Sequence, residues 1–62
     1  MKVLVVNSVD SIHQETIEKA LKPYSQEGSR WKIASVSTVA IERSLGTKFI
    51  ILNTIIALNE IS

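Results

Sequence analysis

The chain has no cysteine and little histidine, glycine, proline or aromatic content. Its 62 residues include one His, two Gly, one Pro and one each of Trp, Tyr and Phe. Without cysteine no disulfide can form, and the single imidazole of His13 does not supply the roughly four ligands that a zinc site needs. We therefore predict no metal site and no cofactor. A chain of this length is expected to form one small domain, residues 1–62.

The sequence also lacks an excess of charge of one sign. Seven Lys and Arg residues stand against six Asp and Glu residues, so the net charge is +1. A near-neutral chain does not create the positive field that drives non-specific binding to nucleic acid. Nucleic acid is therefore not an expected partner.

Long hydrophobic runs are absent as well. The most apolar segment, FIILNTIIAL, has eight apolar residues of ten, with Asn53 and Thr54 at its centre. Crossing a bilayer as a helix takes about 20 apolar residues. The opening run MKVLVV ends at Asn7, short of the roughly 7 to 15 apolar residues of a signal peptide. We expect a cytoplasmic protein without a membrane segment.

No catalytic motif is present. The only glycines, Gly28 and Gly46, cannot form a phosphate-cradling loop or a G-x-S-x-G elbow. A nucleophile needs an oriented base, and His13 is the one imidazole available. At the start of a helix, this side chain is expected to be solvated or packed at an edge. The sequence predicts no catalytic residue and no enzyme.

The first half of the chain predicts a strand and a helix. Val3 to Val6 is a β-branched apolar run typical of a buried strand. Ser11 and Gln14 have the spacing of a capping box, and the apolar residues after them recur at i, i+3, i+4 and i+7. Pro23 should end the helix or distort its last turn. The predicted apolar stripe is Ile17, Ala20, Leu21 and Tyr24.

The second half predicts two strands joined by a turn. Arg30 to Ile41 is β-branched but diluted by Ser and Thr, as in an edge strand. A turn over residues 42–48, with Gly46 as its most permissive residue, leads into a strand from Lys48 to about Glu60. In the first of these strands, alternation places Trp31, Ile33, Val39 and Ile41 in one phase and Ala34, Val36 and Ala40 in the other.

The predicted fold class is α+β, with one helix on a three-stranded sheet in the order βαββ. If the helix carries the chain back across the sheet, the first two strands run in the same direction and the last runs opposite to both. The most hydrophobic strand belongs in the centre, which favours the strand order 1-3-2 over 1-2-3.

The last strand is apolar on both faces, and one helix covers only one. Leaving several Ile-sized side chains in water forfeits about 1.5 to 3 kcal/mol each. We expect a second copy as the partner, packed face to face or joined along a sheet edge. The alternative is that loops and long side chains cover part of this face. The predicted interface residues are Phe49, Ile51, Asn53, Ile55 and Ala57. Within this set, Asn53 either pairs with its copy or the neighbouring strand to fix register, or lies at a bulge or strand end.

Arg30, Trp31 and Lys32 form the only basic and aromatic cluster. Such a cluster can stack a nucleotide base or anchor a protein interface, and it can equally be an edge strand with Trp31 packed inward. Arg43 in the predicted turn is open to the same interpretations.

Two families resemble the chain in part. The opening M-K-V-x-V, the helical I-E-K-A-L at Ile17 to Leu21 and the hydrophobic last strand resemble short sporulation-associated proteins of spore-forming bacteria. That resemblance implies a βαββ fold and no catalytic residues. The size and topology also resemble oligomeric tautomerases, whose amino-terminal proline has no counterpart here because Lys2 follows Met1. Small bacteriophage proteins that disable host defence are similar in size alone.

The sequence favours a small, non-catalytic, homo-oligomeric binding protein that inhibits or regulates a bacterial or host protein, for example a phage-encoded anti-defence protein. The alternative is an oligomer that binds a small ligand or nucleotide in an interface pocket, lined by Trp31 with Arg30 or Arg43. A small oligomeric enzyme of tautomerase-like architecture is the third hypothesis.

Overall fold

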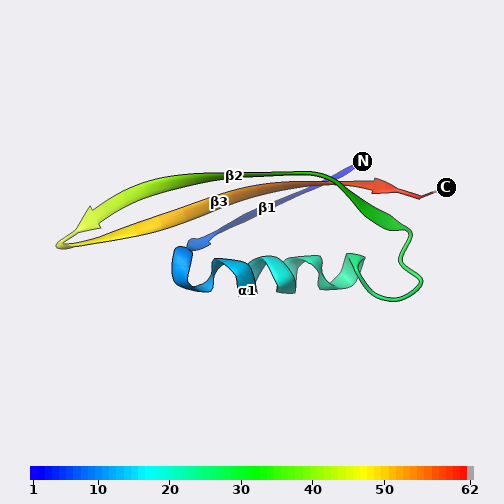
Figure 1. Ribbon diagram of the computed structural model, residues 1–62, viewed down its shortest axis with the longest axis horizontal. Helices are drawn as coiled ribbons and strands as arrows, with labels where there is room; N and C mark the ends of the chain where they lie inside the picture. The colour runs from blue at the N-terminus through cyan, green and yellow to red at the C-terminus, as the bar shows by residue number, and fades with distance from the viewer. Residues whose placement is uncertain (62) are drawn as a thin grey trace.

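The protein folds as one helix on a three-stranded sheet. The computed structural model describes residues 1–61, in the order β1 (Lys2–Val9), α1 (Asp10–Leu21), a short 3-10 helix (Lys22–Tyr24), β2 (Trp31–Leu45) and β3 (Thr47–Glu60). Figure 1 shows the strands in one layer and α1 beneath them. The α+β class and the βαββ order predicted from the sequence are confirmed.

The sheet order is β1-β3-β2, so the most hydrophobic strand is central. Both outer strands pair with β3 in antiparallel fashion, and β1 and β2 therefore run in the same direction. The predicted strand order and directions are confirmed. α1 lies against the sheet and returns the chain from the end of β1 to the start of β2 (Figure 1).

The core lies between α1 and one face of the sheet, which we call the inner face. Val6, Ile56 and Leu58 are buried at its centre. The predicted helical stripe packs against them, with Ile17, Ala20, Leu21 and Tyr24 all in contact with the core. The i, i+3, i+4, i+7 spacing brings these four side chains to one side of the helix, as the sequence predicts.

The helix ends as predicted and begins differently. It stops at Leu21, and Pro23 lies in the 3-10 turn that follows, because proline cannot continue the α-helical hydrogen bonds. At the other end Val9 occupies the N-cap position in extended conformation, without a side-chain cap. The predicted capping box at Ser11 is therefore wrong. Since the chain passes from β1 into α1 without a loop, Ser11 is already inside the helix.

The β2–β3 hairpin is longer than predicted. β2 continues to Leu45, and only Gly46, at a φ of 78°, separates it from β3. Glycine suits this position because L-residues with a side chain rarely adopt positive φ. The predicted reversal at Gly46 and the strand that follows it are confirmed, but the turn is tighter than residues 42–48, because the ladder continues through the pair Leu45 and Thr47.

The pairing of β2 is interrupted once, between Ile33 and Ser35, where the register shifts. The extra residue of this bulge is Ala34, and an odd insertion moves all later side chains to the opposite face. Trp31 and Ile33 therefore share a face with Val36, not with Val39. The single alternation predicted along β2 is wrong for this reason.

Candidate functional site: an open sheet face and a cavity at one end

The sheet face that points away from α1 is the largest feature without a cover, and we call it the outer face. Residues directly opposite in an antiparallel ladder point to the same side, so the pairing defines its members. β1 contributes Val3, Val5, Asn7 and Val9, β2 contributes Ser35, Ser37, Val39, Ile41 and Arg43, and β3 contributes Phe49, Ile51, Asn53, Ile55 and Ala57. All five residues predicted from the sequence as an interface thus lie on this one face.

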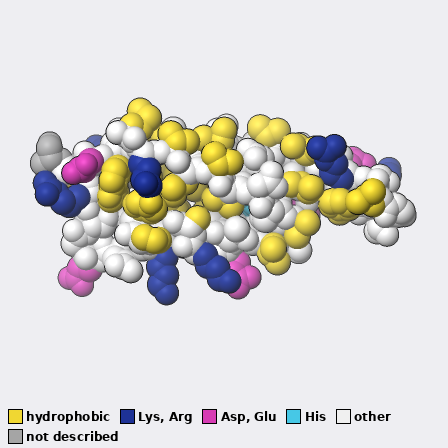
Figure 2. Space-filling view, turned by 180° about the vertical axis from the view of Figure 1, so that it is seen from behind, with side chains coloured by type: hydrophobic (Ala, Val, Ile, Leu, Met, Phe, Trp, Pro, Cys, Tyr) yellow, Lys and Arg dark blue, Asp and Glu magenta, His cyan; other side chains and the backbone are white. Residues whose placement is uncertain are grey.

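No segment of residues 1–61 covers the outer face. Val5 is 65% exposed and Ile55 is 47% exposed, although both lie in the three-stranded part of the sheet. Figure 2 shows hydrophobic side chains along the upper edge of the molecule, above the strands, and charged side chains projecting below α1. The alternative that loops or long side chains cover this face is therefore wrong for the part of the chain that the structure describes.

A row of amides crosses the middle of the outer face. Asn53 of β3 lies opposite Asn7 of β1 on one side and Val39 of β2 on the other. The bulge lies near the start of β2, opposite Ala57 and Leu58, so Asn53 is not at an irregularity, and it is far from both ends of β3. The interpretation of Asn53 as a bulge or strand-end residue is wrong. It occupies the central row of a mainly apolar surface.

One end of the hairpin projects beyond the helix. β1 leaves the sheet at Val9, which pairs with Ile51, so β2 and β3 continue alone through residues 42–50. We call this two-stranded segment the arm, and Figure 1 shows it extending past the first turn of α1. Leu45 at its tip is 85% exposed. A two-stranded hairpin without a packed face has little stability of its own.

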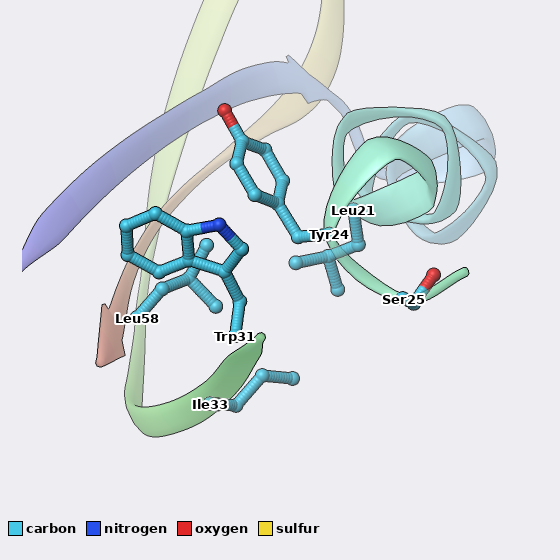
Figure 3. A pocket seen from close by; sticks show the side chains of 6 residues that line it. All are labelled: Leu21, Tyr24, Ser25, Trp31, Ile33 and Leu58. Carbon is cyan, nitrogen blue, oxygen red and sulfur yellow. The ribbon is translucent and has the colours of Figure 1, made fainter. Parts of the chain in front are cut away.

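A half-open apolar cavity of about 270 Å³ lies at the opposite end of the molecule. It forms where the 3-10 turn approaches the start of β2, and Figure 3 shows the rings of Tyr24 and Trp31 facing each other above Leu58. The two rings meet edge to face with centroids 5.9 Å apart. The remaining lining residues are Leu21, Ser25 and Ile33.

The loop before β2 fixes Trp31 at this cavity. The Ser29 hydroxyl donates to the carbonyl of Tyr24 and accepts from the amide of Trp31 at 3.2 Å. Gly28 allows the tight bend with a φ of 83°. On the other side, the amide of Ile61 donates to the carbonyl of Arg30 at 2.5 Å. These bonds connect the start of β2 to the helix turn and to the chain end.

The basic residues predicted as contacts are separated by the fold. Arg30 and Lys32 are exposed on either side of Trp31, and Lys32 points to the outer face while Trp31 points inward. Arg43 lies in the arm, paired with Phe49 near the far end of β2. Within one chain, therefore, Arg43 does not line the cavity. Lys2 instead approaches this end, with its Nζ 5.7 Å from the centroid of the Tyr24 ring.

A partly buried chain of polar side chains links α1 with the three strands. His13 of α1 is only 4% exposed. Its Nδ1 is 2.6 Å from the Ser8 hydroxyl in β1, and its Nε2 is 2.6 Å from the Thr54 hydroxyl in β3. The Thr54 hydroxyl continues to that of Thr38 in β2, at 2.9 Å. The prediction that His13 is solvated or packs at an edge is wrong.

Both imidazole nitrogens of His13 are therefore engaged, one as donor and the other as acceptor when the ring is neutral. The arrangement can hold α1 in register with all three strands, because His13 bonds to β1 and β3 and the Thr54 hydroxyl bonds both to His13 and to Thr38 of β2. The cavity beside Trp31 and Leu58 lies at the other end of the sheet from Ser8. A molecule bound in that cavity would therefore not lie beside the Ser8 hydroxyl.

A signal for the burial of His13 exists in the sequence. His13 lies four residues before Ile17 and so continues the apolar stripe one turn toward the helix start. Thr54 likewise alternates in phase with Ile56 and Leu58. The sequence does not reveal that these two positions meet, because that depends on how the helix is placed along the sheet.

Comparison with known proteins gives no match: no family model, no curated protein and no solved structure is significantly similar to the chain. Within residues 1–61, no helix has the length and apolar content needed to span a membrane. The same residues contain no cluster of three or more His, Asp or Glu side chains that could hold a metal ion.

Proposed function

We propose that this protein is a small, non-catalytic binding protein that works as a homo-oligomer and inhibits or regulates a protein target. The observation that carries the proposal is the open, apolar outer face. Its β3 residues alternate with a buried set on the same strand and are mainly apolar, and yet this face has no cover within residues 1–61.

The size of the outer face fits an interface between two proteins. The eight residues of β1 span about 27 Å at ~3.4 Å per residue, and three strands are about 14 Å wide. With the strip contributed by the arm, the footprint is on the order of 500 Å², close to the lower end of the range of about 600 to 1,000 Å² per partner in stable complexes.

The distribution of charge also supports an interface. Within the rows that β1 shares with its neighbours, the outer face carries no charged side chain. Lys32 and Arg43 lie on the outer face in the rows just beyond those shared with β1, one toward each end. Interfaces between proteins are depleted of charge at their centres and polar at their rims.

If a second copy covers the outer face, other surfaces of the protein are still free to bind a target. β2 is an edge strand over its full length, with backbone groups that a partner strand can pair with. Arg30 and Trp31 stand at the start of this edge, and both residue types are enriched in the residues that dominate binding energy at interfaces. The leftover surfaces thus favour a protein target over a nucleic acid.

The polar chain around His13 supports a role without catalysis. A general base needs a nitrogen that is free to take a proton from a bound substrate. In His13 both nitrogens are occupied by hydroxyl groups, and the ring is buried. Since His13 is the only imidazole and the chain has no thiol, no other side chain of these two kinds is available.

Two aspartate substitutions test the assembly. Ile55 on the outer face and Ile12 on α1 are almost equally exposed, at 47% and 49%. If the outer face joins copies, Ile55→Asp should convert the assembly to monomer in native mass spectrometry, whereas Ile12→Asp should leave its mass unchanged. Ile51→Asp should act as Ile55→Asp does. Unchanged assembly in both outer-face variants would refute the role of this face and point to pairing along a sheet edge.

The end cavity favours a second candidate function, the binding of a small ligand. Its volume of about 270 Å³ is just below the usual range of ligand pockets, roughly 300 to 1,000 Å³, and its lining is mainly apolar. Trp31 and Tyr24 offer aromatic surfaces, so the fitting ligand is a small planar or apolar molecule. Mass spectrometry of the purified, denatured protein should then reveal a retained molecule, and purified Trp31→Ala protein should lack it.

A further inference from the structure

The outer face has a repeating arrangement along the strands that defines how a second copy fits. Seven rows cross it, each set by one pairing of β3. In order, their β3 members are Asn59, Ala57, Ile55, Asn53, Ile51, Phe49 and Thr47. Asn53 is the middle member, with three rows on either side. The polar row is therefore also the geometric centre of the face.

We propose that two copies pack outer face to outer face about a two-fold axis that crosses the strands at the Asn53 row. This inference rests on the proposed assembly and specifies its register. In this arrangement β3 of one copy lies antiparallel over β3 of the other, and Asn53 meets Asn53. Ile51 of each copy then lies over Ile55 of the other, and the two arms point in opposite directions.

The amides supply the first argument for this register. Covering the outer face buries Asn7 and Asn53, and a buried amide needs partners for both its donor and its acceptor atoms. An apolar row placed over them would leave those atoms unpaired, which has a cost in free energy for each buried group. Only a register that stacks the amide row on itself avoids this cost, as buried Asn pairs do in coiled coils.

Side-chain size supplies the second argument. The row of Phe49 lies two rows from the axis on one side, and the row of Ala57 and Ser35 lies two rows from it on the other. The two-fold operation places the bulky row of each copy over the small row of the other. The other face-to-face two-fold, with its axis along the strands, instead stacks Phe49 on Phe49 and Ala57 on Ala57. Well-packed interfaces avoid both the crowding and the gap.

The arm supplies the third argument. Residues 42–50 have no helix beneath them and no third strand beside them. With the axis across the strands, each arm lies over the three-stranded part of the other copy. With the axis along the strands, the two arms would cover only each other, and neither would gain the support of a packed sheet. The proposed register therefore stabilises the segment that most needs it.

Because the natural chain has no cysteine, single thiols can map the register. Asn53→Cys places two thiols on the axis, across sheets that pack about 10 Å apart, within reach of a short bifunctional thiol reagent. Each row is about 6.8 Å from the next, so a thiol at Ile51 or Ile55 lies one row off the axis and about 14 Å along the strands from its own copy.

The expected result for Asn53→Cys alone is a cross-linked dimer. Ile51→Cys and Ile55→Cys proteins should cross-link to each other when the two are unfolded and refolded together, because one copy of each then forms a mixed dimer. Each of the last two alone should stay uncross-linked, as should the control Ile12→Cys on α1. Circular dichroism of every variant checks that it folds, and native mass spectrometry checks that it still assembles.

The outcomes separate this inference from the proposed function. If Ile51→Cys and Ile55→Cys each cross-link to themselves, the axis runs along the strands and the register is wrong. If all variants assemble and none of the outer-face thiols cross-links, the copies meet elsewhere, and the homo-oligomer stands without this interface. A wild-type monomer would instead overturn the proposed assembly itself.

Discussion

Ile55 and Ile56 are neighbours in β3, and their side chains have opposite surroundings. Ile56 is 1% exposed on the inner face, between Leu4 of β1 and Val36 of β2 and under the helix. Ile55 points the other way, between Val5 and Ser37, and nothing in residues 1–61 lies above it. The same residue type is thus core on one face and open surface on the other.

The difference between the two faces indicates which face takes part in assembly. The covered inner face tolerates a polar chain through His13 and Thr54, because every polar group there has a partner. On the open outer face, the four rows that β1 shares are mainly apolar, and their amides lie only in the Asn53 row. A domain of this size has one helix and can bury one face, so the apolar content of the second face points to a cover from outside the chain.

The largest expected loss of stability comes from shortening a buried side chain on the inner face. Ile56→Ala should lower the free energy of unfolding by about 2 to 5 kcal/mol, because it leaves a cavity in a core with few other buried side chains. Urea denaturation followed by circular dichroism measures the loss, which should not change with protein concentration.

The matched variant Ile55→Ala sharpens the comparison of the faces. This substitution acts through assembly, so the loss in the free energy of unfolding should depend on protein concentration. Equal, concentration-independent losses for the two variants would show that both faces are buried within one chain, contrary to the fold described above.

A smaller loss is expected from the polar chain. His13→Ala removes the partner shared by Ser8 and Thr54, and should cost about 1 to 3 kcal/mol in the free energy of unfolding. The neighbouring exposed variant Ser11→Ala serves as control and should stay within about 0.5 kcal/mol of wild type. A loss no larger than that of the control would mean that the imidazole makes no net contribution to the inner face.

The smallest effect is expected in the arm. Glu42 and Lys48 form an ion pair at 3.7 Å, with side chains 66% and 80% exposed. Such pairs contribute about 0 to 1 kcal/mol, so Glu42→Gln should hardly change the denaturation midpoint. A clear loss would indicate that a second copy shields this pair from solvent, which would extend the interface around the arm.

The sequence predicts the layout of the fold well because the strongest patterns are local. The 3.6-residue spacing of Ile17, Ala20, Leu21 and Tyr24 identifies the inner side of the helix, and the apolar content of β3 places it at the centre of the sheet. Pro23 and Gly46 mark the end of the helix and the reversal of the hairpin.

The features that the sequence does not predict are those set by long-range placement. One extra residue at Ala34 moves Trp31 to the inner face and Val39 to the outer face, and no local signal marks that bulge. The pairing of His13 with Thr54 spans 41 positions and depends on where the helix lies along the sheet. The end cavity likewise requires the loop before β2 to bring Trp31 to Tyr24.

The most direct test of the central claim, that a second copy covers the outer face, is the mass of the unmodified protein in solution. Sedimentation equilibrium at micromolar concentration should give twice the mass of the chain, or a larger even multiple of it. A single species with the mass of one chain over the whole concentration range would leave the outer face open to water and contradict the claim.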